Sequence, residues 1–459
     1  MQIDQRYKIN IRDQNITVIG MSRSGMAAAY LAQQLGARVF VSDNTDNPVT
    51  RSNLHKLQDS GINGEIGGHS DQIFATDLWV LSPGIAEDST LVKSALDRHI
   101  PIVSEIEFAS WFTEAPIIAV TGSNGKTTTV HALTEMCQSE TIHGVLAGNM
   151  GVPFAKKVLA DIINPDPARV FILEISSFQM EFILHFKPRI AVFLNISPDH
   201  LDRYPSMSEY ITAKLKMTAN LDLEDYIVFN LDDKILDEKL KSDKAWLVPF
   251  SIKPYAETTY FINNNKIYNF EHATLIPLDA VALPGPHNSA NLLAAATAAH
   301  LIGIPDETIA TVMHTFRGVP HRLEEVAVVN GITYVNDSKA TNLDAVKVAL
   351  QSYPGPIILI LGGKDKGGDF AELIPYFADK VKLIIAIGQA RPKISAALRD
   401  AARPIAVEGL RDAVKITRES AESGDVVLLS PGCASFDQFR DFEDRGDQFR
   451  EIVMELVND

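Results

Sequence analysis

The chain contains very little cysteine and no long apolar segment. Only two of its 459 residues are cysteines, Cys137 and Cys433, and their wide separation gives no metal-binding spacing. Two unpaired thiols suit a protein of the reducing cytoplasm, and we expect both cysteines to be small residues of the hydrophobic core. No run approaches the ~20 apolar residues of a membrane helix, and residues 1–14 are polar and mixed in charge, unlike a signal peptide. We therefore expect a cytoplasmic protein that does not insert into a membrane.

Basic residues are also in short supply. The chain has 42 Lys and Arg against 58 Asp and Glu, a formal net charge of -16. Nucleic-acid partners require basic patches that neutralise phosphates, so this balance argues against them. A small anionic substrate needs only a locally positive pocket. With 46% hydrophobic and 22% charged residues, the composition is that of an ordinary globular protein, long enough for about three domains.

A glycine-containing loop follows the apolar run at residues 117–120. From Thr121 to Thr128 it reads TGSNGKTT, and a segment that can form a helix follows. Strand, glycine loop and helix together are typical of nucleotide-phosphate sites, because loop amides and the helix N-terminus face the anion. Lys126 is expected to reach the terminal phosphates, and the Thr127 hydroxyl to bind Mg²⁺. The loop has two residues between its glycines, whereas the general phosphate-loop motif has four. This departure from the general motif predicts a particular kind of ATPase.

Strand and helix signals alternate along the whole chain. Apolar strand-like runs occur at 16–20, 38–42, 78–81, 117–120, 170–174, 190–195, 357–361, 383–386 and 426–429. Such alternation predicts parallel sheets with helices packed on them. We expect an α/β protein of three domains: a Rossmann-like N-terminal domain (1–110), a central P-loop ATPase-like domain (111–317) and a Rossmann-like C-terminal domain (318–459). Asn263-Asn264-Asn265 and Asn330-Gly331 predict hairpin turns.

The first glycine turn allows two interpretations. Residues 20–25 read GMSRSG, a dinucleotide-binding pattern with Ser22 in place of the middle glycine, and Asp43 follows the second strand-like run. An NAD-dependent oxidoreductase would use these residues for the cofactor. A nucleotide-sugar substrate could instead place its diphosphate on the same turn. The better nucleotide loop downstream disfavours the first interpretation.

Three further residues are candidates for chemistry in the central section. Glu174 closes an apolar run, and a carboxylate at a strand end beside a phosphate loop is the expected position of a Mg²⁺ ligand. His200 lies near the end of the next run, where a metal or phosphate role competes with that of an ordinary surface or core histidine. Lys214 lies in a helix-like segment, and on composition alone it is a solvated lysine.

Together with further motifs, these residues resemble the Mur ligase family, the ATP-dependent amide-forming enzymes that assemble the peptidoglycan stem peptide. The resemblance covers essentially the whole chain. Its motifs are TGSNGKTT at 121–128, GNMG at 148–151, LEISSFQ at 173–179, DHLDRY at 199–204, GPHN at 285–288, HR at 321–322, NDSKAT at 336–341 and SPGCASFDQF at 430–439. The last two are most similar to those of the members that add D-glutamate.

The resemblance implies a set of site residues. Catalytic roles would fall to Lys126, His200 and Lys214. The ATP site would comprise Gly122, Ser123, Asn124, Gly125, Lys126, Thr127, Thr128, Asn288, Asn291, Arg322 and Asp337. Two Mg²⁺ ions would be held by Thr127, Glu174, His200 and Lys214, the last as a carbamate formed with CO₂. The UDP-sugar would contact Gly20, Ser22, Arg23, Ser24, Asp43, Asn44, Ser82, Pro83, Gly84 and Asn149. D-Glutamate would contact Lys339, Thr341, Lys366, Ser435, Phe436 and Phe442.

The implied reaction joins D-glutamate to UDP-N-acetylmuramoyl-L-alanine through an acyl phosphate, in cytoplasmic peptidoglycan precursor synthesis, and the implied enzyme is a monomer with small-molecule substrates. A different Mur ligase, or an enzyme like folylpolyglutamate synthase, would share the phosphate loop and differ in the C-terminal pocket. A nucleotide-binding protein without catalysis is disfavoured by the joint presence of Lys126, Glu174 and Lys214. The segment GGKDK at 362–366 offers two lysines, so Lys364 is an alternative to Lys366.

Overall fold

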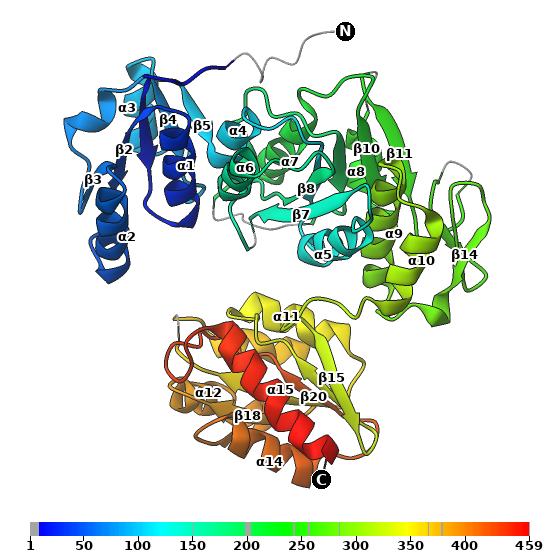
Figure 1. Ribbon diagram of the computed structural model, residues 1–459. Coiled ribbons are helices and arrows are strands. Elements are labelled where there is room, and N and C mark those ends of the chain that lie inside the picture. Colours follow the sequence, from blue (N-terminus) through cyan, green and yellow to red (C-terminus); the bar gives the residue numbers. More distant parts are fainter. Residues whose placement is uncertain are drawn as a thin grey trace. The chain divides into compact units, whose positions relative to one another are not determined.

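The chain folds into two compact units, each built from parallel sheets and helices. The computed structural model describes residues 9–458 apart from 150, 198–202, 242–243, 256–257, 284, 366 and 378–379. The first unit is Met1–Phe316 and the second is Arg317–Asp459 (Figure 1). His200 and Lys366, both predicted site residues, lie outside the described residues.

The first unit begins with a five-stranded parallel sheet in the order β3-β2-β1-β4-β5. All four residues of β4 are buried, as expected for a strand covered on both faces. The strands are β1 (Asn15–Ile19), β2 (Arg38–Asp43), β3 (Asn63–Ile66), β4 (Leu78–Leu81) and β5 (Ile102–Ser104). The helices are α1 (Arg23–Gln34), α2 (Pro48–Asp59), α3 (Thr90–Asp97) and α4 (Glu105–Ser110).

A six-stranded parallel sheet follows in the order β11-β10-β9-β6-β8-β7. Its strands are β6 (Ile117–Thr121), β7 (His143–Gly148), β8 (Arg169–Glu174), β9 (Ile190–Phe193), β10 (Tyr226–Asn230) and β11 (Trp246–Phe250). β6 lies between β8 and β9, so the segments that leave these three strands meet at one sheet edge. Ligands of open parallel sheets bind at this carboxyl edge.

Helices cover this sheet, and a small antiparallel sheet completes the unit. The helices are α5 (Lys126–Met136), α6 (Phe154–Ile163), α7 (Met207–Leu215), α8 (Lys234–Lys239), α9 (Pro286–Leu301) and α10 (Asp306–Thr315). The small sheet contains β12 (Phe261–Asn263), β13 (Lys266–Tyr268) and β14 (Thr274–Pro277). β12 and β13 pair around Asn264 and Asn265, whose φ angles of 46° and 58° are those of a type I′ hairpin, which confirms the predicted turn.

One hydrophobic core runs through both large sheets of the first unit. It contains Val18 of β1, Phe108 of α4 and Phe171 of β8, all fully buried. α1 and α4 pack against α6 of the central domain (Figure 1). Phe154 at the start of α6 in turn contacts Phe171 of β8 edge to face, with the ring centroids 5.1 Å apart. The two sheets therefore share buried apolar surface, which holds them together as one unit.

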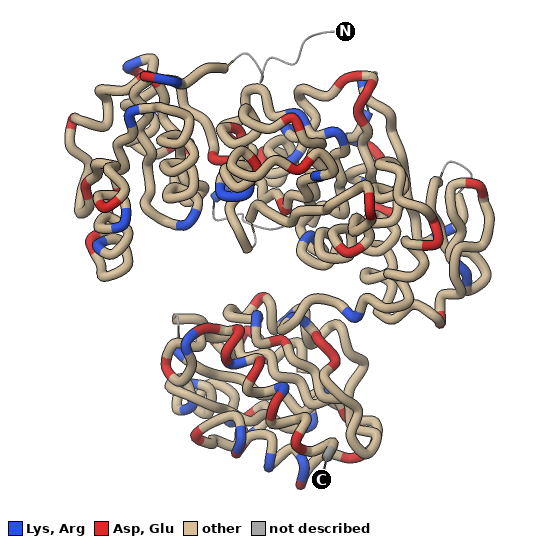
Figure 2. Tube along the Cα trace, viewed as in Figure 1, with Lys and Arg blue, Asp and Glu red and all other residues tan. Residues whose placement is uncertain are grey.

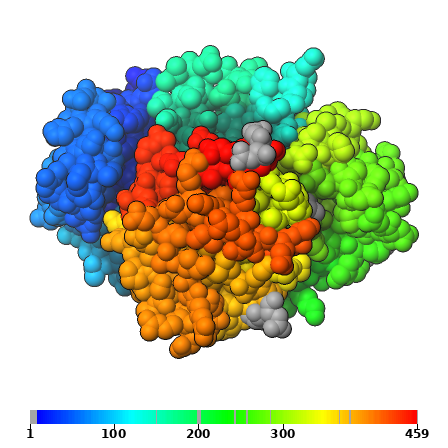
Figure 3. Space-filling model, turned by 90° about the horizontal axis from the view of Figure 1, so that it is seen from below, coloured from blue at the N-terminus to red at the C-terminus, as the bar shows by residue number. Residues whose placement is uncertain are grey.

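The second unit is built on a six-stranded sheet in the order β15-β16-β20-β17-β18-β19, parallel except for the β15–β16 hairpin. Its strands are β15 (Glu324–Val329), β16 (Ile332–Asn336), β17 (Ile357–Gly362), β18 (Val381–Ile387), β19 (Ile405–Ala406) and β20 (Val426–Leu429). Its helices are α11 (Leu343–Ser352), α12 (Arg391–Ala397), α13 (Arg399–Ala402), α14 (Leu410–Ser420) and α15 (Phe442–Asn458). In the space-filling view the atoms of this unit are coloured from yellow through orange to red (Figure 3). The predicted turn is confirmed at Asn330-Gly331, where both φ angles are positive.

Charged residues of both signs are interspersed along the chain, with Asp and Glu more numerous (Figure 2). Among the described helices, none combines the length and apolar character of a membrane span.

Candidate active site

The phosphate loop joins β6 to α5, and Gly125 fixes its shape. Gly125 has a φ of +87° and precedes the first residue of α5. A Cβ at this position would lie 2.1 Å from Asn291 Oδ1 of α9, so only glycine fits both the backbone angle and the space. No side chain caps α5, and the N-terminus of a helix is a favourable position for an anion.

Residues that follow β9 hold the loop in place. Asn124 N donates to Asn195 Oδ1 at 2.8 Å, and Asn195 Nδ2 donates back to Asn124 O at 3.1 Å. The Ser123 hydroxyl accepts from Ser197 N and donates to Ser197 O, both at 2.9 Å. These reciprocal bonds preorganise the loop, so little ordering would accompany phosphate binding.

Two predicted catalytic lysines meet at one carbonyl of this loop. Lys126 Nζ donates to Gly122 O at 2.7 Å and to Ser123 O at 2.9 Å. Lys214 Nζ donates to the same Gly122 O at 3.0 Å and lies 4.8 Å from the centre of the Tyr210 ring. Lys214 is 2% exposed, so its interpretation as a solvated helix lysine is wrong: α7 turns this side chain toward the sheet edge. The two ammonium groups supply positive charge where phosphates would bind.

Glu174 ends β8 beside the loop. The strand register pairs Glu174 with Val120 of β6 and with Gly148 of β7. Glu174 is 2% exposed; its Oε1 accepts from Asn149 Nδ2 at 3.0 Å. Its Oε2 is buried and has no hydrogen-bond partner among the described residues. A buried carboxylate oxygen without a hydrogen-bond partner costs free energy of folding. A cation bound to Glu174 Oε2 would remove this cost.

The donor set suits Mg²⁺ better than a transition metal. Thr127, at the start of α5, is buried and carries a hydroxyl, and Glu174 offers one open carboxylate oxygen. Within the described residues, no group of three His, Cys, Asp or Glu side chains forms a metal cluster. Mg²⁺ is typically held by one or two protein oxygens together with phosphate oxygens and water, and these residues fit that requirement.

A cavity of about 240 Å³ lies where the N-terminal and central sheets meet. Five predicted substrate residues line it: Ser22, Arg23, Ser24, Pro83 and Asn149. Five residues that the sequence interpretation gave no role complete the lining: Glu105, Gly148, Gly151, Pro153 and Gln179. Arg23 Nη1 donates to Gly151 O at 3.2 Å, so a hydrogen bond between the two domains joins two of the lining residues.

Other predicted substrate residues shape the turn near this cavity without lining it. Gly20 has a φ of +100°, and a Cβ there would lie 2.5 Å from Ser82 Oγ. Asp43 accepts from Met21 N at 2.7 Å and from Thr45 N at 2.8 Å. Asp43 therefore orders the glycine turn itself. The cavity lining does not include Asn44 or Gly84.

Glu105 is a buried carboxyl group in the cavity wall. Its Oε1 accepts from Ala155 N in the first turn of α6 at 2.6 Å. Burial raises the pKa of Glu105 to about 7, although the Ala155 and Phe154 amides act in the opposite direction. The sequence gives no sign that Glu105 belongs to a site, because an acidic residue at the start of a helix such as α4 is typical of any helix N-terminus.

An ion pair fixes the neighbouring loop. Arg203 forms two hydrogen bonds to Glu181, with Nη2–Oε2 at 2.6 Å and Nε–Oε1 at 3.2 Å. The same guanidinium donates to Pro83 O at 3.1 Å and Ile85 O at 3.2 Å. Tyr204 OH also donates to Glu181 Oε1 at 2.9 Å. The central domain thus holds the 82–85 loop of the N-terminal domain by a pair that the sequence interpretation did not identify.

The remaining predicted ATP residues are divided between the two units. Asn288 and Asn291 lie in the first turns of α9 in the first unit, and Arg322 and Asp337 belong to the second. Asp337 follows β16 and is 5% exposed; it accepts from Ser430 Oγ at 2.8 Å and Leu323 N at 3.2 Å. Burial raises the pKa of Asp337 to about 7, against the opposing effect of Ser430, Leu323, Arg322 and Lys339.

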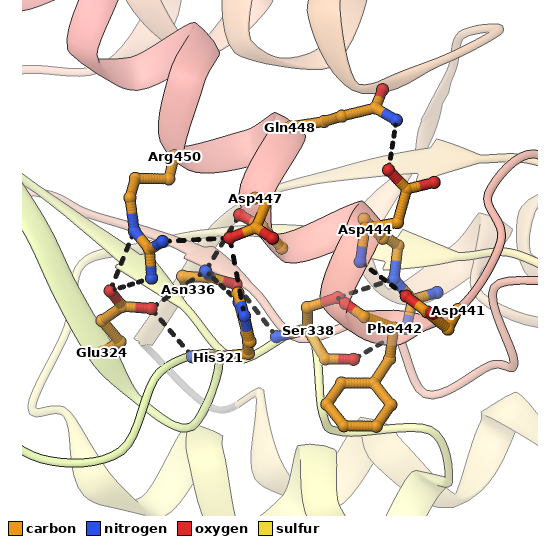
Figure 4. Close-up of polar contacts among 12 residues, drawn as sticks. His321, Glu324, Asn336, Ser338, Asp441, Phe442, Asp444, Asp447, Gln448 and Arg450 are labelled. Carbon is orange, nitrogen blue, oxygen red and sulfur yellow. Dashed lines mark hydrogen bonds and ion pairs between the residues drawn. The ribbon is translucent and has the colours of Figure 1, made fainter.

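The residues that precede Arg322 and Asp337 in the chain, His321 and Asn336, belong to one polar network (Figure 4). Asn336 is fully buried; its Nδ2 donates to Glu324 Oε2 and to Gly446 O, both at 3.1 Å, and contacts His321 Nδ1 at 3.1 Å. Glu324 pairs in turn with Arg450 of α15 at 2.6 Å. The pKa of His321 is lowered, mainly by burial. The network ties the residues next to Arg322 and Asp337 to α15.

The predicted D-glutamate residues lie on adjoining segments of the second unit. Lys364 N donates to Ala434 O at 2.8 Å, and Ala434 N donates back to Lys364 O at 3.2 Å. Ser435 is buried, Phe436 is 66% exposed, and Phe442, Lys339 and Thr341 are half-buried. Lys364 and Phe436 line a cavity of about 440 Å³ together with Gly388, Gln389, Arg391, Asp437 and Gln438. The structure therefore places the alternative lysine, Lys364, beside a predicted D-glutamate residue.

Arg445 organises these segments and was missed by the sequence interpretation. It is fully buried in α15 and donates to Ser338 O at 2.7 Å, Ser338 Oγ at 2.9 Å and Cys433 O at 3.2 Å. Burial lowers the pKa of this guanidinium to about 10. The available signal was Gly446, since an isolated glycine inside a helical pattern indicates close packing: a Cβ there would lie 2.1 Å from His321 Nδ1.

Comparison with known proteins identifies the family. Three family models match along the chain: the Mur ligase MurD-like N-terminal domain at residues 14–104, the Mur ligase middle domain at 120–299 and the Mur ligase glutamate ligase domain at 321–433. A relative from Salinibacter ruber, named UDP-N-acetylmuramoylalanine--D-glutamate ligase, is 39% identical over 97% of this chain and 99% of its own length. A relative of the same name from Bacillus cytotoxicus is 40% identical over 97% of this chain and 98% of its own. The chain belongs to the Mur ligase family.

Solved structures agree with this fold assignment at lower identity. A MurF ligase from Thermotoga maritima, crystallised with ADP, has a TM-score of 0.56 at 14% identity and covers 99% of this chain and 97% of its own. A pseudomurein peptide ligase type C from Methanothermus fervidus has a TM-score of 0.54 at 18% identity, over 97% and 100% of the two chains. The predicted Mur ligase resemblance and three-domain α/β architecture are thus confirmed.

Proposed function

We propose that this chain is the ATP-dependent ligase that adds D-glutamate to UDP-N-acetylmuramoyl-L-alanine in cytoplasmic peptidoglycan precursor synthesis. The observation that carries the proposal is the sheet edge at β6, β8 and β9, where Lys126, Lys214 and the open oxygen of Glu174 surround one phosphate loop. Relatives that carry the D-glutamate ligase name match the chain over nearly its whole length, which supports this amino acid over those used by other members of the family.

The UDP-sugar is proposed to occupy the 240 Å³ cavity and the adjoining glycine turn. Arg23 would face the diphosphate, and the backbone near Gly20 would approach it closely. Asn149 also lines this cavity and donates to Glu174, and it would meet the muramoyl side of the substrate. This orientation directs the substrate carboxylate toward the phosphate loop.

The reaction begins when a substrate carboxylate oxygen attacks the γ-phosphorus of ATP and the bond to ADP breaks. The loop amides and Lys126 would stabilise the negative charge on the transferring group. Two Mg²⁺ ions, when bound at Thr127, Glu174, His200 and a carbamate of Lys214, would neutralise phosphate charge. The amine of D-glutamate then attacks the acyl carbon, the bond to phosphate breaks, and an amide and inorganic phosphate are released. His200 or the Lys214 carbamate would accept the proton that the amine loses.

Residues of the second unit are proposed to hold the other substrates. Arg322 and Asp337 would contact ATP, while Lys339, Thr341, Ser435, Phe436, Phe442 and either Lys364 or Lys366 would contact D-glutamate. Lys364 is exposed beside Phe436, so an ammonium group is available to a carboxylate there. The proposed enzyme acts as a monomer.

Phosphate release by the purified protein tests this function. The assay contains ATP, Mg²⁺ and UDP-N-acetylmuramoyl-L-alanine with a panel of amino acids. We expect release only with D-glutamate. Release with a different amino acid would keep the ligase reaction and overturn the substrate assignment, whereas no release with any amino acid, from protein that binds ATP, would overturn the catalytic proposal.

A further inference from the structure

Asn149 is the residue that belongs to both the substrate cavity and the cation site. It lines the 240 Å³ cavity, and its Nδ2 donates to Glu174 Oε1 at 3.0 Å. Its backbone N–H donates to Glu174 O at 2.8 Å. Asn149 is therefore fixed to Glu174 twice, once through the side chain and once through the main chain.

The turn before Asn149 is built for this close approach. Gly148 has a φ of +107°, and a Cβ there would lie 2.4 Å from Glu174 O. Any other residue at 148 would push the turn away from β8. The backbone contact is therefore independent of the asparagine side chain, and removal of the side chain leaves the turn attached.

The side-chain bond decides which carboxylate oxygen is available. Glu174 Oε1 is occupied by Asn149, whereas Oε2 is buried and has no partner in the described part of the chain. The rotation of the carboxylate is thus set by one donor. Outer residues that orient a metal-binding carboxylate commonly change metal affinity 10- to 100-fold when they are mutated.

We propose that Asn149 is a positioning residue that orients Glu174 toward Mg²⁺, in addition to its contact with the sugar substrate. An amide has two N–H donors and a carbonyl oxygen, so one N–H can remain on Glu174 while the other groups face the cavity. The inference rests on the proposed function, because it requires a Mg²⁺-nucleotide site at Glu174.

The test measures the Mg²⁺ concentration that half-saturates ADP binding, by calorimetry, with neither UDP-sugar nor amino acid present. Two variants remove the donor: N149L keeps the branched shape and the number of side-chain heavy atoms, and N149A is smaller. The control is P153A, because Pro153 lies in the same cavity lining, has no proposed substrate or metal role and carries no side-chain hydrogen-bond donor. We expect the two Asn149 variants to need 10- to 100-fold more Mg²⁺, and P153A to need the same amount as the parent.

A second measurement separates positioning from general damage. In an E174Q background the oriented carboxylate is already lost, so N149L should change the Mg²⁺ requirement no further. A parental Mg²⁺ requirement in both Asn149 variants would overturn the inference and leave the proposed function standing, as would an equal further loss in E174Q. Failure of the parent protein to bind ADP in a Mg²⁺-dependent way would overturn the proposed function and the inference together.

Discussion

Arg203 should be among the most sensitive positions of the first unit that lie outside the phosphate loop. Replacement by methionine keeps an extended side chain but removes the guanidinium. Glu181, whose side chain is 6% exposed, would then keep, among the described residues, only the Tyr204 hydroxyl as a side-chain partner. Pro83 O and Ile85 O would also lose their donors. The change therefore leaves a buried charge uncompensated and releases the 82–85 loop.

The expected magnitude follows from the burial of the pair. Breaking a buried ion pair by removing one partner costs about 3 to 5 kcal/mol, because the other charge stays buried. At roughly 2 °C per kcal/mol for a large domain, the unfolding midpoint of R203M should fall by about 6 to 10 °C. Removal of both charges in R203M/E181M should cost clearly less than the sum of the single changes. The loop contacts the proposed UDP-sugar site, so KM for that substrate should rise roughly tenfold, about 1.4 kcal/mol.

Calorimetric unfolding and steady-state kinetics check both parts. R98M is the control, since Arg98 is an exposed arginine of the same unit that donates to the Ser94 carbonyl and lies over the Phe74 ring; its midpoint should fall much less than that of R203M. KM for ATP and for D-glutamate should stay constant in R203M. A midpoint shift below about 2 °C, or additive effects of R203M and E181M, would refute the role of the pair.

Three further changes test other parts of the structure. G125A should abolish ADP binding, because the residue has a positive φ and its Cβ would meet Asn291, while G303A, with the same sign of φ and open space around it, should leave calorimetric binding intact. D337N should remove a pH dependence of the free energy of unfolding. The folded-state pKa of Asp337 is raised to about 7 from 3.8, so the folded parent binds a proton that the unfolded chain releases, and its stability should fall by up to about 4 kcal/mol as pH rises from about 4 to 7. Unfolding experiments on the parent and on D337N over this pH range isolate that fall. R445M should lower the unfolding midpoint of the second unit and raise KM for D-glutamate, because the guanidinium joins the Ser338 and Cys433 segments. KM for the UDP-sugar should stay unchanged. An unchanged KM for D-glutamate would contradict this role of Arg445.

The fold was largely predictable because its main signals are local. Continuous apolar runs such as 117–120 become strands buried on both faces, and Asn330-Gly331 forms its hairpin since few other dipeptides accept two positive φ angles. The shared core of the N-terminal and central sheets was not predictable, because the packing of α1 and α4 against α6 joins segments far apart in the chain and has no sequence periodicity.

The site was predictable where chemistry requires a motif. Gly125 and Lys126 follow from the needs of a phosphate loop, and the carboxyl-edge position of Glu174 follows from the strand that precedes it. Lys214 could not be recognised as buried from its helix, because one inward-facing lysine among polar neighbours has the pattern of a solvated face. The role proposed for Lys214 rests on family resemblance, and its burial is seen only in the structure.

Buried charges at the boundary between the first two domains explain the most important omissions. Glu107 is fully buried and accepts from Leu184 N, His185 N and Phe186 N at 2.7 to 3.0 Å; Glu105 and Arg203 make comparable bonds across the same boundary. Each is a charged residue at a place where a sequence pattern predicts a solvated surface. An apolar contact tolerates small shifts, whereas a carboxylate that accepts several amides is satisfied in one arrangement. These charges therefore fix the relative position of the substrate cavity and the phosphate loop, which a shared apolar core alone would define less closely.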